Sequence, residues 1–392
     1  MSIPASVSQL TSRAAELRDL LIRWCNQNSG SENLAGLAAM RDLLTAGFGS
    51  LPGARVEHLT LVGTAVLALR IKVRPEAPVQ LFFSGHYDTV YGAEDPFQKC
   101  ELLSPEKLRG PAVIDMKGGL VVMLAALQAF EQTPHDGRIG YEVLLNPDEE
   151  IGSFGAAPLF VEAARRHRLG LVFEPARPNG DLVQSRKGTG NFTITSRGHA
   201  AHAASAKRDG RNAIAALAEF LVVANRLPEE ISGVLVNVGS IRGGGPATNV
   251  VPDFAQALLD VRVTQLAERE TVLARFNAAA APINARDGHR LEISGGFNRP
   301  PMEATPVTAA AFAAWQRCAR DLGLASFSWV HAGGASDANN LSAAGLPCLD
   351  GLGPVGDRLH SPDEWIHLPS LVERAQLAAL FLHRLAAGEI KL

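Results

Sequence analysis

The first half of the chain alternates between two apolar patterns. Apolar residues at helical spacing predict helices over Ser6–Cys25, 34–47 and Gly118–Phe130. Short apolar runs predict strands near 54–60, 64–72, 79–84, Tyr141–Asn146 and Leu171–Phe173. The 118–130 segment is apolar nearly all round, so we expect a buried helix there. Strands alternating with helices predict an α/β layer built on a largely parallel sheet.

The pattern changes after about residue 188. It predicts, in order, strand Gly190–Arg197, helix Ala213–Leu227, strands Gly233–Ile241 and Phe254–Thr264, helix Leu266–Ala281 and strand Arg290–Ser294. This order is that of a ferredoxin-like split unit. Helices over 306–321 and 369–387 and strands over 326–330 and 347–350 follow. We therefore expect one domain made of 1–187 and 298–392, with a second domain, 188–297, inserted into it.

Composition narrows the classes of function. The 392 residues carry a net charge of -3, from 37 basic and 40 acidic residues, which gives no general field for nucleic acid or for a membrane surface. The four cysteines lie far apart and form no Cys-x-x-Cys pair, so neither a thiolate zinc site nor a disulfide scaffold is expected. Neither a signal peptide nor an apolar run long enough to span a bilayer is evident. We expect a cytoplasmic protein with reduced thiols.

Three glycine clusters begin at Gly188, Gly243 and Gly333. A nucleotide-binding fingerprint needs a glycine-rich turn between a strand and a helix, and none of the three clusters has that context. Turns or close backbone approaches are the better interpretation. A dinucleotide-dependent oxidoreductase is disfavoured for the same reason.

The first candidate for chemistry is the motif His86-Tyr87-Asp88, which directly follows the predicted strand 79–84. A histidine in this position could bind a metal ion through one ring nitrogen, while Asp88 orients the other. The simpler alternative is a histidine that is only hydrogen-bonded. The polar elements further along the chain favour the metal.

Four further polar elements come after predicted strands or lie near the C-terminus. They contain Asp115, the run Asp148-Glu149-Glu150, Glu174 and His360. Taken alone, Asp115 could simply cap the next helix. The run of three carboxylates is harder to explain in that way, because buried like charges need a neutralising cation.

Strand ends in an open α/β sheet converge on one edge, where ligands bind. Two histidines and three carboxylates would form a paired divalent site, and this thiolate-free donor set suits zinc or a similar ion. Two such ions can activate one water and polarise one carbonyl. A carboxylate that binds no metal is then needed to accept the proton of the water, and the pair Glu149-Glu150 offers one ligand and one base.

With these five elements in this order, the chain resembles the two-domain zinc exopeptidases, a family that includes glutamate carboxypeptidase, succinyl-diaminopimelate desuccinylase, acetylornithine deacetylase, aminoacylase and peptidase T. The resemblance covers essentially the whole chain and is strongest to glutamate carboxypeptidase. It implies a three-layer α/β catalytic domain with an inserted ferredoxin-like dimerisation or lid domain. It also implies two zinc ions per subunit, with cobalt or manganese as substitutes, and a cis peptide after Asp115.

By resemblance, His86, Asp115 and Glu174 would bind one ion, and Asp115, Glu150 and His360 the other. Asp115 would then bridge the two ions. Glu149 would be the general base, and Asp88 would orient His86.

The inserted domain contributes further residues by resemblance. His202, in the motif Gly198-His199-Ala200-Ala201-His202, would reach the active site of a partner subunit and stabilise the oxyanion, so a homodimer is implied. Asn249 and Arg299 would bind the substrate, with Arg299 suited to hold a carboxylate bidentately. Gly334 would present its backbone to the substrate. The simpler interpretations are a surface histidine at a helix entry and an arginine at a domain hinge.

These expectations amount to a metal-dependent hydrolase that cleaves an amide bond next to a free α-carboxylate. The released residue would be glutamate or a similar amino acid, from an N-acyl or peptidyl conjugate. An N-acyl amino acid deacylase or a dipeptidase of the same family is the first alternative. A catalytically inactive two-domain binding protein is the second, which the intact set of ligands and base disfavours.

Overall fold

The structure, a computed structural model, describes residues 3–134 and 137–391. The chain divides into two compact units. Unit 1 comprises Met1–Ser185, Ala304–Ala332 and Ser336–Leu392, and unit 2 comprises Arg186–Glu303 and Gly333–Ala335. The expected insertion, 188–297, lies within unit 2.

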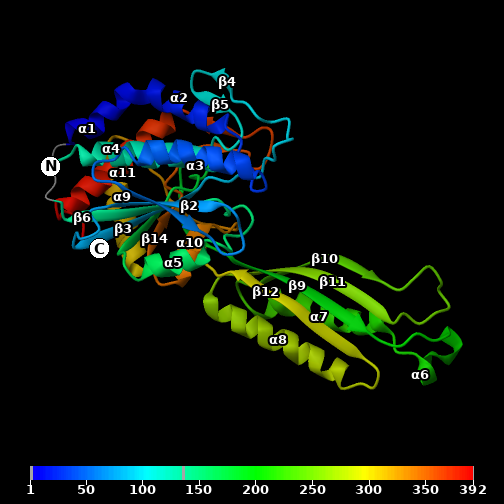
Figure 1. Cartoon of the computed structure of the whole chain (residues 1–392). Coiled ribbons are helices and arrows are strands. Elements are labelled where there is room, and N and C mark those ends of the chain that lie inside the picture. Colours follow the sequence, from blue (N-terminus) through cyan, green and yellow to red (C-terminus); the bar gives the residue numbers. More distant parts are fainter. Residues whose placement is uncertain (1–2, 135–136, 392) are drawn as a thin grey trace. The chain divides into compact units, whose positions relative to one another are not determined.

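Unit 1 is built on an eight-stranded sheet (Figure 1). In spatial order its strands are β1 (Arg55–Thr60), β2 (Leu67–Val73), β6 (Ile139–Asn146), β3 (Val79–His86), β7 (Leu169–Val172), β14 (Cys348–Asp350), β8 (Leu182–Arg186) and β13 (Trp329–Ala332). The central strands β6, β3, β7 and β14 pair in parallel. Because β2 is antiparallel to both β1 and β6, and β14 to β8, the sheet is mixed and not largely parallel.

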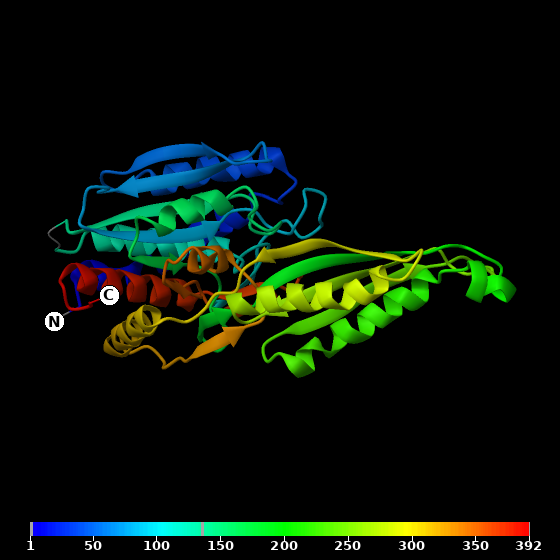
Figure 2. The ribbon, with the colours of Figure 1, turned by 90° about the horizontal axis from the view of Figure 1, so that it is seen from below.

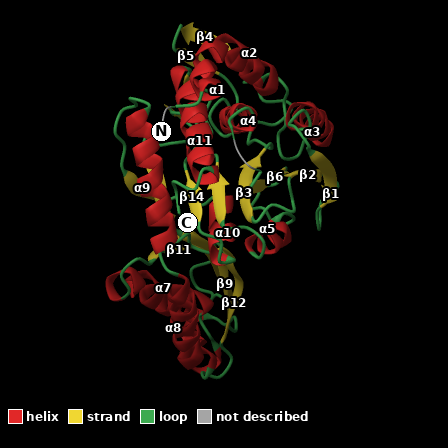
Figure 3. Ribbon diagram, turned by 90° about the vertical axis from the view of Figure 1, so that its left-hand side faces the viewer, coloured by secondary structure: helices red, strands yellow, loops and turns green. Residues whose placement is uncertain are grey.

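Helices cover both faces of this sheet, which gives the expected three layers. The longer helices are α2 (Ala14–Cys25), α3 (Leu34–Phe48), α4 (Lys117–Glu131), α9 (Pro306–Asp321) and α11 (Pro369–Ala386). Helices α4 and α11 lie on one face, and α5 (Ala157–Ala164) and α10 (Asp337–Ala343) on the other (Figure 3). Every residue of β6 is buried, as is nearly every residue of α4, so these elements form the centre of the core.

The first predicted helix is interrupted. Instead of one helix over 6–25, the chain forms α1 (Ala5–Ser8), a 3₁₀ turn over Gln9–Arg13, and then α2. The Ser12 hydroxyl donates to the carbonyl of Gln9 at 2.7 Å, a local bond that competes with regular helix geometry. The buried positions Leu10, Leu17 and Leu21 nevertheless face the same core, as their spacing predicts.

A small four-stranded sheet completes unit 1 and was not predicted. It consists of β4 (Glu101–Ser104), β5 (Lys107–Arg109), β15 (Gly356–Asp357) and β16 (Trp365–His367), in the order β15-β16-β5-β4. Its strands are two to four residues long, too short for apolar periodicity to reveal. The sheet joins the segment before Asp115 to the segment after His360, because Trp365 pairs with Arg109.

Unit 2 has the expected ferredoxin-like arrangement. Its strands are β9 (Gly188–Arg197), β10 (Leu235–Gly243), β11 (Phe254–Val263) and β12 (Arg290–Arg299). They form an antiparallel sheet in the order β10-β11-β9-β12. Helices α7 (Ala213–Glu230) and α8 (Leu266–Asn284) pack side by side on one face, and a short helix α6 (Ala206–Asp209) precedes them (Figure 2).

The fold class predicted from the sequence is thus confirmed: a mixed α/β unit together with a separate small antiparallel unit. Among the described helices, none has both the length and the apolar character needed to cross a bilayer.

Candidate active site

The register of the central sheet brings distant polar residues to one edge. On the parallel strands β3 and β6, His86 pairs with Asn146, and on β3 and β7, Ser84 pairs with Val172. The residues that follow β6 and β7, including Glu174, therefore emerge level with His86. The Nε2 atom of His86 lies 3.9 Å from a carboxylate oxygen of Glu174.

Asp115 lies at the centre of this cluster. One of its carboxylate oxygens is 3.2 Å from Nε2 of His86, and the other is 3.0 Å from Nε2 of His360. The first residue of α4 is Lys117, and the helix has no side-chain cap, so Asp115 is not the helix cap that the sequence left open. The peptide bond between Asp115 and Met116 is cis, as the resemblance implies.

Glu150 and His360 complete the group. A carboxylate oxygen of Glu150 lies 3.3 Å from Nε2 of His360. Its other oxygen, Oε1, is buried and has no hydrogen-bond partner among the described residues. All five predicted metal ligands thus meet, although they come from five separate segments of unit 1.

Asp88 connects two parts of the cluster. Its Oδ1 lies 3.3 Å from Nδ1 of His86. Its two oxygens also accept hydrogen bonds from the backbone amides of Glu149 and Glu150, both at 3.1 Å. Ser31 donates to it from its hydroxyl at 2.9 Å. The carboxylate therefore holds the His86 ring and the turn that carries the predicted base in a fixed relation.

The ionisable groups of the cluster shift one another's pKa values. Burial lowers the pKa of His86, but its hydrogen bonds to Asp115 and Asp88 outweigh burial and raise that pKa well above its usual value. Hydrogen bonds from Asp115 and Glu150 raise the pKa of His360 to about 11. Burial raises the pKa of Glu150. Without a metal ion, protons on the two histidines therefore compensate the carboxylates.

These residues fit divalent metal ions. The donor set is imidazole and carboxylate without thiolate, which suits zinc and its neighbours. Ligand atoms of His86, Asp115 and Glu150 all lie within 4.8 Å of one another. The free Oε1 of Glu150 is a further sign, because a buried carboxylate oxygen without a donor calls for a cation.

Binding of zinc should release protons, because the ions would replace the protons that the histidines share with carboxylates. At pH 7.5 we expect about two protons released for full loading, one each from His86 and His360. The affinity for zinc should accordingly fall as the pH falls. Titration calorimetry in two buffers of different ionisation enthalpy measures the number released. A number close to zero would contradict this account of the cluster.

Two contributors to the site were missed by the sequence analysis. Glu364 is fully buried, and its carboxylate accepts hydrogen bonds from the backbone amides of Ala112, Ile114 and Asp115. The Tyr91 hydroxyl lies 2.7 Å from the same carboxylate. The one signal in the sequence was an acidic residue four positions after His360, directly before the apolar pair Trp365-Ile366.

The remaining predicted residues belong to unit 2. His202 is exposed, and its Nδ1 accepts a hydrogen bond from the backbone of Ala204 at 3.2 Å. The segment of Asn249 lies beside it, since the Asn249 carbonyl accepts from the amide of Ala203 at 2.9 Å. Arg299 ends β12 and is buried. None of these positions is among the ligands of the unit 1 cluster.

Gly334 is held by a neighbouring arginine in the same unit. Its carbonyl accepts a hydrogen bond from Nη1 of Arg186 at 3.1 Å. The backbone that the sequence assigned to substrate contact is thus fixed by a buried cation.

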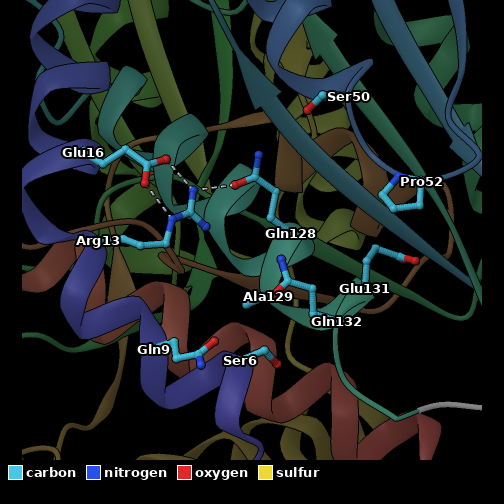
Figure 4. A pocket seen from close by; sticks show the side chains of 10 residues that line it. All are labelled: Ser6, Gln9, Arg13, Glu16, Ser50, Pro52, Gln128, Ala129, Glu131 and Gln132. Atoms are coloured by element: carbon cyan, nitrogen blue, oxygen red, sulfur yellow. Dashed lines mark hydrogen bonds and ion pairs between the residues drawn. The ribbon is translucent and has the colours of Figure 1, made fainter.

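A separate hollow of about 490 Å³ lies in unit 1 between the N-terminal helices and the end of α4 (Figure 4). Its one arginine, Arg13, is bound by Glu16 at 2.7 Å and by Gln128 at 2.8 Å. The lining contains no histidine and none of the predicted ligands. Its chemistry therefore offers nothing comparable to the cluster around Asp115.

Comparison with known proteins agrees with this geometry. The family model described as Peptidase family M20/M25/M40 matches residues 82–384, which include all five predicted ligands. The chain belongs to this family. It is therefore a metal-dependent peptidase or amidohydrolase, and the family resemblance predicted from the sequence is confirmed.

The sequence identity to individual family members is low. The chain is 25% identical to carboxypeptidase G2 of Pseudomonas sp. (strain RS-16) over 380 residues, which covers 94% of this chain and 89% of the relative. It is 29% identical to succinyl-diaminopimelate desuccinylase of Gluconobacter oxydans, over 77% of this chain and 80% of the relative. The structure of the aminopeptidase PepT of Bacillus cereus is similar in fold, with a TM-score of 0.77 at 21% identity, and covers 98% of this chain and 100% of that one.

Proposed function

We propose that this M20 enzyme hydrolyses an amide bond next to a free α-carboxylate and releases C-terminal glutamate or a similar amino acid from an N-acyl or peptidyl conjugate. The observation that carries the proposal is the cluster of two histidines and three carboxylates that has Asp115 at its centre. The similarity to carboxypeptidase G2 over 94% of the chain supports the carboxypeptidase side of the proposal.

Two divalent ions, zinc in the first instance, would be held by His86, Asp115 and Glu174 and by Asp115, Glu150 and His360. Bound there, they would supply an acidic water and a polarised substrate carbonyl. Glu149 would accept the proton of the attacking water and pass it to the leaving amine. Its position next to a ligand, on a turn fixed by Asp88, supports this role.

Substrate recognition would fall to unit 2. Arg299 would bind the terminal carboxylate with two parallel hydrogen bonds, and Asn249 and the backbone of Gly334 would add further contacts. His202 accepts a hydrogen bond at Nδ1, which leaves Nε2 as the nitrogen that can donate. That nitrogen could then donate to the oxyanion of the reaction, as the family role of His202 requires.

A homodimer through unit 2 is part of the proposal. Strand β10 is an edge strand and has unpaired backbone groups to offer. Apolar side chains on this strand and on the adjacent α7 are exposed, among them Ile241 at 61% and Val222 at 53%. Exposed apolar residues next to an open edge support a protein contact at this surface. The four free cysteines support the expected reducing, cytoplasmic compartment.

The similarity to a desuccinylase favours a second candidate, an N-acyl amino acid deacylase. A panel of conjugates separates the two. Release of glutamate, aspartate and ornithine from a common acyl group tests the carboxyl side, and N-succinyl against N-benzoyl conjugates of one amino acid test the acyl side. Faster release of glutamate across acyl groups supports the carboxypeptidase, whereas dependence on the succinyl group supports the deacylase.

Replacing Arg299 by methionine is expected to lower kcat/KM for these conjugates by about 10- to 100-fold, the range for hydrogen bonds to a charged group. Amide analogues without the free carboxylate should be affected little. Arg290→Met is the matched control, because Arg290 is an exposed arginine on the same strand. Equal losses for acids and amides would contradict the assignment of Arg299.

A further inference from the structure

Glu364 occupies an unusual position for a glutamate. Its side chain is fully buried, yet it forms no ion pair with an arginine or lysine among the described residues, and the buried Lys117 acts on it only over a longer distance. Its Oε1 accepts from the amides of Ile114 at 2.9 Å and Asp115 at 3.1 Å. Its Oε2 accepts from the amide of Ala112 at 3.1 Å and lies 2.7 Å from the Tyr91 hydroxyl. A carboxylate that is this completely engaged by backbone amides fixes the path of that backbone.

The backbone it fixes is the turn that presents Asp115. Ala112 has a φ of 56°, in the left-handed region that side chains other than glycine rarely adopt. A conformation of this kind persists only where surrounding contacts impose it. The bond from the Ala112 amide to Glu364 is one such contact. The next two bonds reach the amides of Ile114 and of Asp115 itself.

The backbone of Glu364 also closes the turn that presents His360. The backbone amide of Glu364 donates to the carbonyl of Ser361 at 3.0 Å, and the backbone carbonyl of Glu364 accepts from the amide of Gly110 at 3.1 Å. His360 also has a positive φ, 57°. The Tyr91 hydroxyl, which contacts the Glu364 carboxylate, also lies 2.9 Å from the Ser361 carbonyl. One residue thus joins the segments of Asp115 and His360, which lie far apart in the sequence.

We propose that Glu364 is a positioning residue that sets the distance between Asp115 and His360 and so determines the affinity of the second metal position. This inference rests on the proposed two-metal function. Asp115 belongs to both positions, whereas His360 belongs only to the second. A change in the distance between the two turns should therefore weaken the binding of the second ion more than the binding of the first.

The test is zinc affinity, measured with a chelating indicator, in the wild type and in Glu364→Gln. The carbonyl oxygen of the glutamine can still accept from backbone amides, but the NH2 group that replaces the second carboxylate oxygen cannot, so part of the clamp is lost. We expect the second zinc ion to bind about 10- to 100-fold more weakly, the range for residues that orient ligands, with less than about a threefold change for the first ion. In a His360→Ala background, where the second position has already lost the ligand that Glu364 is proposed to place, Glu364→Gln should add little.

Glu142→Gln is the matched control. Glu142 is also a buried glutamate of unit 1, but its carboxylate contacts Arg70 and Arg166 at 3.0 and 3.1 Å and not the cluster. The Glu142→Gln variant should have a lower thermal unfolding midpoint but should bind both zinc ions as tightly as the wild type. If Glu142→Gln selectively weakens the second ion as well, a general loss of stability explains the effect and the proposal is wrong.

Two outcomes separate this proposal from the proposed function. A wild type that binds no divalent ion overturns the function, whereas two ions bound equally well by wild type and Glu364→Gln overturn only the positioning role. Should Glu364→Gln fail to fold, Tyr91→Phe removes one hydroxyl from the same clamp. It should weaken the second ion by about 3- to 10-fold, as the loss of a single hydrogen bond predicts, and unchanged affinity would overturn the proposal.

Discussion

Replacing Glu149 by alanine is expected to abolish measurable turnover while both metal ions stay bound. General base catalysis by a side chain is typically worth about 10²- to 10⁴-fold, so we expect a loss of about 10³-fold or more in kcat. The proposed ligand Glu150 is untouched by this change. Its amide still donates to Asp88, and its carboxylate still lies beside His360. Zinc content by mass spectrometry and kcat on the preferred conjugate are the two measurements.

The pattern of the two measurements identifies the role of Glu149. A base that acts only on the proton of the water affects kcat, and KM should change little. Glu149→Gln should be as inactive as Glu149→Ala, because an amide has no basic oxygen for the proton. Glu106→Ala is a control, since Glu106 is an exposed glutamate in the turn between β4 and β5. Retained activity in Glu149→Gln would remove the assignment, and loss of zinc would mean that Glu149 is a ligand.

The convergence of the five ligands could be predicted because each follows a recognisable signal. His86 ends a buried strand, and Glu174 comes two residues after another. In a parallel sheet such residues must meet at one edge, so the predicted strands already imply that His86, Glu150 and Glu174 converge. Asp115 and His360 lie in loops, and their place in the ligand set came from the family resemblance. The three consecutive carboxylates after an apolar strand indicated a metal site, because a cation can offset the repulsion between buried negative charges.

The role of Glu364 could not be predicted, because its partners are backbone amides. Backbone groups carry no sequence signal, and the turn over residues 110–116 lies far away along the chain. The strands that bring the two segments together, β5 and β16, have three residues each. Periodicity cannot detect elements of that length. Clamps of this kind become visible only once tertiary contacts are known.

The sheet was predicted to be largely parallel, and the reason for the error lies in the connections. Between β1, β2 and β3 the chain has no helix. Parallel neighbours need a crossover connection, whereas a short loop joins antiparallel strands. The strands 54–60 and 64–72, already predicted close together, should have indicated an antiparallel pair. The parallel prediction holds where crossovers contain helices, as between β3 and β6, which α4 connects.

Replacing Asp115 by asparagine is expected to have the largest effect on metal binding. Asp115 lies between the two histidines, one carboxylate oxygen on each. It is the only residue assigned to both ions, so removing its charge weakens both positions and also removes the ligand that holds them close. Loss of a residue outside the ligand set costs about 10- to 100-fold in metal affinity, and loss of a shared ligand should cost more for each ion.

The experiment compares zinc content and the affinity of each ion in wild type, Asp115→Asn and Asp181→Asn. Asp181 is the control, because it is a buried aspartate of unit 1 that accepts hydrogen bonds from Ser328 and Asn179 and does not contact the cluster. We expect less than one zinc per chain after dialysis of Asp115→Asn, and no hydrolysis. Asp181→Asn should keep both ions.

A comparison with His360→Ala tests whether Asp115 is shared by both ions. Loss of His360 removes a ligand of one ion only, so this variant should keep the first zinc and lose the second. Asp115→Asn should lose both, in a single step of the chelator titration. If instead Asp115→Asn keeps one ion at wild-type affinity, Asp115 serves one position and the two ions do not share a ligand. In that case a residue other than Asp115 would have to hold the two ions close enough together to act on one water.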